Sequence, residues 1–167
     1  MNQKKFALKY LFKVFFTEDH SRFLEFINEY GVNSVEKQDK RSVLMYCILQ
    51  KKENYALELI HNGADINYQD KQGYTALHFA VQENLHDVVS SLLTNHADVN
   101  KSDINGNTPL WRAMYNRKVI SHSIIIALLT AGADINKQNN HGIAPSKYLD
   151  DSVEEVIEWL NNNKTKI

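Results

Sequence analysis

The chain has 167 residues, of which 43% are hydrophobic and 23% are charged, so it is globular and long enough to bury a core. Its formal net charge of −1 gives no overall field that would favour nucleic acid or an anionic membrane. The single cysteine, Cys47, excludes an internal disulfide framework and suits a reducing compartment, so we expect a cytoplasmic protein.

The N-terminal stretch MNQKKFALKYLFKVFF combines basic and apolar residues, as a signal peptide does. Lys9 and Lys13 interrupt its apolar part, however, and no small-residue cleavage site follows. The longest apolar run of the chain, residues 124–129, is too short to span a bilayer. We therefore interpret the N-terminus as an amphipathic helix. One side of this helix carries Lys5, Lys9 and Lys13, and another carries Leu8, Leu11 and Phe15.

The chain repeats itself with a period of 33 residues. The segment GADINYQDKQGYTALHFA, residues 63–80, returns as HADVNKSDINGNTPLWRA, residues 96–113. Leu44, Leu77 and Leu110 share this spacing. Three extra residues between about Arg117 and Ser123 lengthen the next period to 36, and we expect them to extend a helix or the following loop without breaking the register. Such a period predicts stacked units, each too small to bury its apolar faces alone.

Each unit is predicted to hold two short helices and an extended turn. Thr75 and Thr108 are placed to cap the first helix, and Pro109 suits the first helical position. Gly63 and Gly132 follow the second helix, where a left-handed residue is favoured. Apolar residues recur at helical spacing at Leu77, Ala80 and Val81 in the first helix and at Val88, Val89, Leu92 and Leu93 in the second.

These features resemble the ankyrin repeat, whose signature Thr-Pro-Leu-His-x-Ala stands here as TALHFA at 75–80 and TPLWRA at 108–113. The resemblance implies an all-α fold, an α-solenoid of stacked helix-turn-helix ankyrin repeats with β-turn fingers. We expect at least nine helices in antiparallel pairs and no substantial sheet. The unit at 37–69 departs from the pattern, because KQDKRSVLMYC lacks the turn glycine and the Thr-Pro pair.

We predict a single domain over residues 1–167. It comprises an N-terminal capping unit at 1–36, repeats at 37–69, 70–102 and 103–138, and a C-terminal capping unit at 139–167. In the last unit, Ser152 and Glu155 have the spacing of a capping box that opens a helix.

No residues form a recognisable catalytic or metal site. The seven histidines include no zinc-ligand spacing, and there is no phosphate-binding glycine loop or nucleophile elbow. His78 stands at the family's structural histidine position, and Cys47 stands at a small core position. Asp65, Asp98 and Asp134 recur in every unit, as turn residues do. We therefore predict no enzyme, no cofactor and no metal. The lysines of the turns lie beside acidic residues, so we expect no nucleic-acid binding.

The resemblance implies protein binding through the turn tips and the exposed side of the first helices, the concave face. Residues at i, i+4 and i+8 of each first helix lie nearly in line there, and large aromatic residues on such a face are typical of binding hot spots. An alternative is that Trp111 packs sideways between helices in place of the family's histidine. The candidate partner-binding residues are Arg41, Met45, Leu49, Lys71, Gln72, Tyr74, Gln82, Ile104, Asn105, Asn107, Trp111 and Tyr115.

The sequence thus predicts a monomeric, non-enzymatic module that binds another protein by stoichiometric occupancy and contacts neither nucleic acid nor membrane. The resemblance to small free-standing bacterial ankyrin proteins favours an inhibitor or immunity protein that blocks a toxin or an enzyme. Two alternatives stay open: a bacterial effector or adaptor that binds a host or regulatory protein, and an assembly subunit that self-associates.

Overall fold

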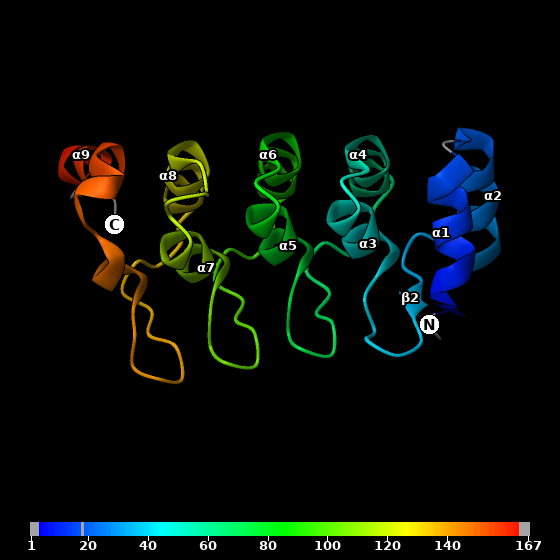
Figure 1. The fold of residues 1–167 in the computed structure, drawn as a ribbon, viewed down its shortest axis with the longest axis horizontal. Coiled ribbons are helices and arrows are strands. Elements are labelled where there is room, and N and C mark those ends of the chain that lie inside the picture. The colour runs from blue at the N-terminus through cyan, green and yellow to red at the C-terminus, as the bar shows by residue number, and fades with distance from the viewer. Residues whose placement is uncertain (1–3, 18, 164–167) are drawn as a thin grey trace.

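The computed structural model describes residues 4–17 and 19–163; the ends of both predicted capping units lie outside these ranges. Helical hairpins stack side by side in one row, as predicted (Figure 1). The described residues form nine α-helices: α1 (Leu8–Thr17), α2 (His20–Tyr30), α3 (Val43–Leu49), α4 (Glu53–His61), α5 (Ala76–Gln82), α6 (His86–Thr94), α7 (Pro109–Tyr115), α8 (His122–Thr130) and α9 (Glu154–Asn162). Two short 3₁₀ helices, η1 (Pro145–Tyr148) and η2 (Asp151–Val153), precede α9. The all-α solenoid is therefore confirmed.

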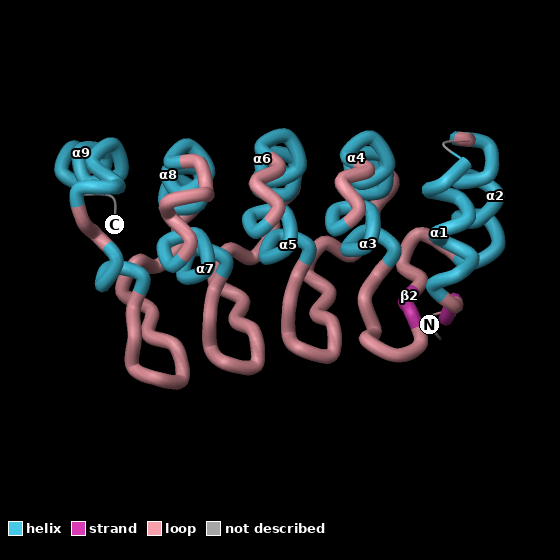
Figure 2. The backbone as a smooth tube through the Cα atoms, viewed as in Figure 1, coloured by secondary structure: helices cyan, strands magenta, loops and turns pink. Residues whose placement is uncertain are grey.

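Long loops between the hairpins project to one side of the row (Figure 2). We call them fingers and define them as residues 31–42, 62–75, 95–108 and 131–144. The helices α3, α5 and α7 lie between the fingers and the second helices α4, α6 and α8 (Figure 1). The only strands among the described residues are β1 (Lys5–Phe6) and β2 (Val35–Glu36), which pair in parallel at the N-terminal end.

The predicted caps of the first helices are confirmed. The Thr75 hydroxyl accepts a hydrogen bond from the His78 backbone N–H, and Thr108 accepts one from Trp111. Pro109 occupies the first turn of α7, where its missing N–H leaves no bond unmade. The repeat that departs from the signature uses Ser42 in the same way.

One polar side chain organises the tip of each finger. An Asp70 oxygen accepts the backbone N–H groups of Gln72 and Tyr74, both at 2.9 Å. Asp103 and Asn139 do the same in the next two fingers. In the first finger Glu36 replaces them, and Lys40 adopts a φ of 60° where the other fingers have glycine. The first finger therefore turns without the glycine, because a neighbouring acid and a left-handed lysine stabilise a turn at the same place with different hydrogen bonds.

A ladder of asparagines joins the bases of the fingers. The side-chain oxygens of Asn33, Asn67 and Asn100 each accept the backbone N–H of a residue in the next finger: Asp65 at 2.7 Å, Asp98 at 2.8 Å and Asp134 at 3.0 Å. Each of these aspartates in turn accepts a backbone N–H two residues later. The aspartates are therefore turn residues, as predicted.

The hydrophobic core runs continuously through the stack. Leu44, Leu77 and Leu110, which share the 33-residue spacing, are each at most 1% exposed. Cys47 is fully buried at the equivalent of Ala80 and is a free thiol. The inserted residues lengthen the α7–α8 loop and not the helix, because α5 and α7 both have seven residues. The stack keeps its register, since Ile124 and Leu128 remain buried in α8.

Two predictions for the capping units are wrong. The N-terminal helix begins only at Leu8, and Lys5 lies in β1, which pairs with β2. The capping box of Ser152 and Glu155 does not form. Asp150 accepts the Ser152 backbone N–H and caps the short η2 helix, so Val153, which has no capping side chain, precedes α9.

Candidate protein-binding surface

The structure divides the candidate residues between the two ends of the first helices. Leu49, Gln82 and Tyr115 are the last residues of α3, α5 and α7. Leu49 is half-buried, Gln82 is exposed, and Tyr115 is 57% exposed. The finger tips precede the other end of these helices, which are about 10 Å long. These two edges, and not one continuous line, are accessible to a partner.

The prediction that Met45 and Asn107 face solvent is wrong. Met45 is 1% exposed and Asn107 9%. Met45 is the third residue of a seven-residue helix that packs against both α4 and α5, and its side chain belongs to the hydrophobic core. Asn107 lies between fingers, where it donates to Asp103 and accepts a hydrogen bond from Asn139 at 2.8 Å.

Trp111 satisfies the alternative interpretation. It is half-buried, and its indole N–H donates to the Ile143 carbonyl of the next finger at 3.0 Å. His78, at the equivalent position of α5, lies 3.1 Å from the Asn107 carbonyl through its Nε2. Tryptophan thus replaces the family's histidine as the side chain that holds the following finger.

The remaining surface of Trp111 belongs to an aromatic cluster with Tyr115 and Tyr148. The Trp111 and Tyr115 rings stack with their centroids 5.2 Å apart. Tyr148 of η1 meets both rings edge-on, at 5.8 and 5.7 Å. The cluster spans α7 and the last unit, so its three side chains hold one another in place. Sequence reasoning missed Tyr148, although it lies 36 residues after Arg112, which is the period of the last unit.

An ion pair borders the aromatic cluster. The Arg117 guanidinium lies 5.6 Å from the Tyr148 ring centroid and pairs with Asp150. The hydrogen bond from Arg117, with a further one from Ser152, holds the pKa of Asp150 well below its usual range. The same hydrogen bond to Asp150 raises the pKa of Arg117. The two charges therefore neutralise each other at the edge of an apolar surface.

Arg41, another candidate, clamps two repeats together. Its Nε lies 3.2 Å from an Asp70 carboxylate oxygen in the next finger, and the Asp70 side chain is 1% exposed. The guanidinium also lies 5.2 Å from the Phe79 ring of that repeat. Arg41 is therefore a structural residue of the junction between repeats.

Tyr74 belongs to the equivalent clamp at the next junction. There the cation comes from the following repeat, because Arg112 lies 4.5 Å from the Tyr74 ring and 3.5 Å from the buried Asp103 carboxylate. Gln82 extends this contact by accepting a hydrogen bond from Arg112 at 3.2 Å. Sequence reasoning missed Arg112, which no repeat signature marks.

The finger-tip candidates are exposed, and backbone hydrogen bonds link the tips. The tip residues Lys71, Gln72, Ile104 and Asn105 are all exposed, Ile104 to 59%. The Gln72 carbonyl accepts the Ile104 N–H at 3.0 Å, and the Asn105 carbonyl accepts the Asn140 N–H at 2.9 Å. The tips therefore form one connected edge.

The titratable groups noted in the sequence serve the fold. Burial lowers the pKa of His78 to about 4, so the ring is neutral at pH 7 and bonds to Thr75 and to the Asn107 carbonyl. Burial also raises the pKa of the Cys47 thiol, which keeps it protonated and unreactive. The described residues contain no group of three or more potential metal ligands.

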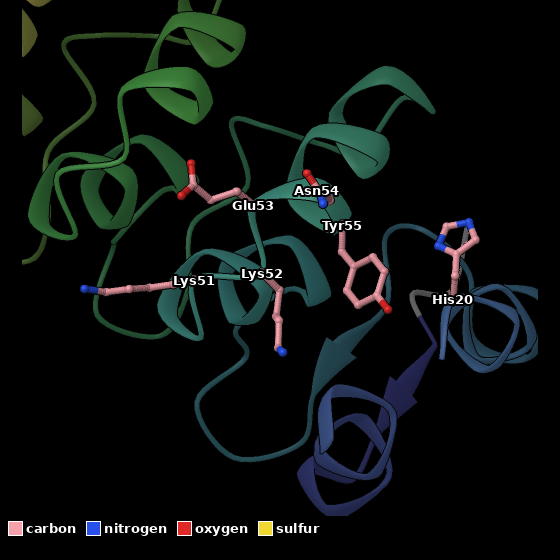
Figure 3. Close-up of a pocket in the computed structure, with 6 residues that line it drawn as sticks. All are labelled: His20, Lys51, Lys52, Glu53, Asn54 and Tyr55. Carbon is pink, nitrogen blue, oxygen red and sulfur yellow. The ribbon is translucent and has the colours of Figure 1, made fainter. Parts of the chain in front are cut away.

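A shallow hollow of about 580 Å³ lies on another part of the stack, where α2 meets the α3–α4 turn (Figure 3). Its lining residues are His20, Lys51, Lys52, Glu53, Asn54 and Tyr55. Tyr55 stacks on Phe23 with ring centroids 4.1 Å apart. The hollow contains none of the candidate residues.

Within the described residues, no helix is both long and apolar enough to cross a membrane. A family model for ankyrin repeats, written for three copies, matches residues 10–103 and again residues 44–139. No curated protein sequence shows a significant match. Repeat stacks of this family are protein–protein interaction modules and are typically not enzymes. The repeat signature, the stacked fold and the family model agree, and this chain belongs to the ankyrin repeat family.

Proposed function

We propose that the chain binds one partner protein through the two accessible edges of the α3–α5–α7 side. The carrying observation is the aromatic cluster, in which Tyr115 is 57% exposed yet held by Trp111 and Tyr148. An aromatic residue that is already ordered loses little conformational entropy on binding, and burial of its ring contributes strongly to affinity. The finger tips supply the polar rim of the contact.

Charge supports a protein as the partner. The finger lysines Lys71, Lys101 and Lys137 alternate with Asp65, Asp98 and Asp134. A mixed pattern of this kind forms no continuous basic track along which a phosphate backbone would lie. It matches the mixed polar rim of a protein interface.

We further propose that binding acts by occupancy, so that the chain blocks the surface of a toxin or an enzyme. The rigidity of the surface supports this mode. The candidate residues sit on helices and on fingers that are tied together by backbone hydrogen bonds, which makes the surface rigid. A rigid extended surface can cover a partner's functional site in a one-to-one complex without supplying any chemistry.

The experiment uses Trp111→His combined with Tyr115→Ala. The histidine retains a ring N–H that can bond to the Ile143 carbonyl, as His78 does to Asn107, while the stacked aromatic surface is lost. Immobilised wild-type and variant chains are incubated with an extract of the cells that express the gene. A purified retained protein is then titrated with both chains by calorimetry. We expect a stoichiometry of one and a loss of affinity of at least about thirtyfold, equivalent to ~2 kcal/mol.

The matched control changes Asp87 and Thr94, two exposed residues of α6, to alanine. This variant should retain wild-type affinity. If it loses binding while the aromatic variant keeps it, the partner uses the side of the second helices. If the complex forms and leaves the partner's activity unchanged, the blocking role is wrong.

A further inference from the structure

The N-terminal end of the stack exposes apolar side chains. Phe16 is 87% exposed, Tyr10 44% and Leu24 41%, and these are half of the exposed large hydrophobic residues that the structure describes. The outer face of a terminal repeat is normally polar, because it has no neighbour to cover it. An end with this composition is suited to a partner.

A groove between α1 and α2 defines how this end is arranged. Tyr10 and Val14 of α1 line it on one side, and Phe26 and Tyr30 of α2 line it on the other. Because α1 ends at Thr17, α2 begins at His20 and the two helices pack against each other, residue heights along the groove run in opposite directions. By this geometry Lys9 lies level with Glu29, and Lys13 lies level with Glu25, each to within about one residue's rise of 1.5 Å.

The charges at this end differ between the two helices. The exposed strip of α1 carries Lys9 and Lys13, and that of α2 carries Glu25 and Glu29, together with Arg22, which pairs with Asp19 at the start of α2. Each pair has i, i+4 spacing, which is about 6 Å along a helix. Among the described residues, no ion pair joins the two strips to each other. The end surface therefore presents the two lysines of α1 beside the two glutamates of α2, over the same length of helix.

We propose that two copies of the chain dimerise through this end surface. The two-fold axis runs parallel to α1 and α2 along the groove, so that α1 of each copy lies antiparallel on α2 of the other. This rotation preserves height, and it brings Lys13 opposite Glu25 of the second copy and Lys9 opposite Glu29 of the second copy. Because the contact is isologous, every charge pair occurs twice.

The apolar residues at the margins fit the same arrangement. Helical periodicity places Phe16 and Leu24 on the flanks of α1 and α2 that face away from the groove. By the same geometry they lie about two residues, or roughly 3 Å, apart in height, so the rotation brings Phe16 of one copy beside Leu24 of the other at both margins. A two-fold axis perpendicular to the helices would instead place lysine on lysine, which like-charge repulsion disfavours.

The area of the contact between the two copies limits the strength of this dimer. Two helices of ten or eleven residues, about 15 Å long and 10 Å wide each, give each copy a contact face of about 300 Å², which is below the size of stable interfaces and in the range of weak, transient ones. We therefore expect a dimer with a micromolar dissociation constant that weakens as salt rises. The inference goes beyond the proposed function, because it uses the opposite end of the stack from the aromatic cluster and replaces the predicted monomer.

Sedimentation velocity of the intact chain over a concentration series tests the proposal. The wild type should pass from the mass of one chain to that of two. Lys9→Glu with Lys13→Glu should raise the dissociation constant at least tenfold, and so should Glu25→Lys with Glu29→Lys. An equimolar mixture of these two variants should recover the dimer, because each basic strip again faces an acidic one. Circular dichroism checks that both variants retain the helical fold.

The matched control reverses two exposed glutamates at the other end of the stack, Glu154→Lys with Glu158→Lys. This variant should dimerise like the wild type. A wild type that stays monomeric into the high micromolar range overturns the proposal. So does a mixture that fails to dimerise, or a control that loses the dimer, since the latter indicates head-to-tail contact between basic and acidic ends. Loss of the dimer leaves partner binding through Tyr115 intact, so the two proposals fail independently.

Discussion

His78 shows how one residue couples the stack to pH. Its buried ring has a pKa of about 4, against 6.5 for an unperturbed histidine, because burial disfavours the charged form. Between these two values the unfolded chain binds a proton at this residue and the folded chain does not. Stability from His78 is therefore fully present above about pH 6.5 and falls as the pH drops toward 4.

The resulting prediction concerns the free energy of unfolding in urea at pH 7.5 and at pH 4.5. The wild type should lose roughly 2–3 kcal/mol more over this interval than His78→Gln does, since one pKa unit is worth 1.36 kcal/mol. Changing the exposed His141 to Gln gives the control, and its pH dependence should match the wild type. Equal slopes for the wild type and His78→Gln would contradict the role assigned to the buried ring.

At the scale of elements, the junctions between repeats use one clamp in two orientations. Arg41 reaches forward to Asp70 and Phe79 at the first junction. At the second junction the ring and the arginine exchange places. Tyr74 of the earlier repeat stands at the position of Arg41, and Arg112 of the later repeat stands at the position of Phe79. In both cases the guanidinium contacts a buried aspartate at the base of a finger tip. At the third junction, between the repeat at 103–138 and the last unit, Asn139 replaces the aspartate. The two clamp positions there are Asn107 and Tyr148, so this junction carries neither the buried carboxylate nor the arginine.

This exchange predicts coupling between Tyr74 and Arg112. Arg112→Phe leaves the Asp103 carboxylate buried without its cation, and Tyr74→Arg brings two cations together, so each should cost about 2–4 kcal/mol in the free energy of unfolding. The double variant reproduces the arrangement of Arg41 and Phe79. We expect it to recover at least about 1 kcal/mol relative to the sum of the two single losses, measured by a double-mutant cycle in urea.

A control cycle pairs Tyr74→Arg with Val119→Ala, a change in the exposed α7–α8 loop. The two losses should add without coupling there. Additivity in the Tyr74–Arg112 cycle would mean that the two junctions do not share one clamp.

Sequence reasoning recovered the helices and fingers because their determinants are local and recur: Thr108, Pro109 and the finger aspartates act within a few residues. It misplaced Met45 and Asn107 because a repeat period shows which positions are equivalent and not which neighbour they face. A seven-residue helix between two others has most of its circumference buried. The aromatic cluster was found in part, since Trp111 and Tyr115 share a helix while Tyr148 comes from the next unit. Neither clamp was predicted, because each joins residues 38 apart in sequence.

At the scale of the whole molecule, the stack behaves as a one-dimensional chain of units. Each first helix contacts its own second helix and the first helices of adjacent repeats, and α9 packs on α8 at the end. Stability in such an arrangement is the sum of unit terms and nearest-neighbour interfaces. The position of a lesion along the row should therefore decide how much of the molecule it unfolds.

Leu110→Asp and Val156→Asp provide the comparison, because both side chains are fully buried in the wild type. Each variant places an unpaired carboxylate in the core, at a cost of several kcal/mol. Leu110 lies in α7, with interfaces on both sides, so its loss should disrupt the repeats at 70–102 and 103–138 together and remove most of the helical circular dichroism. Val156 lies in the last helix and has a neighbour on one side only. Its variant should fray the last unit, keep most of the helical signal and unfold in urea with a smaller m-value than the wild type. Equal losses of helical signal in the two variants would mean that the stack folds as one indivisible unit and that position along the row carries no energetic meaning.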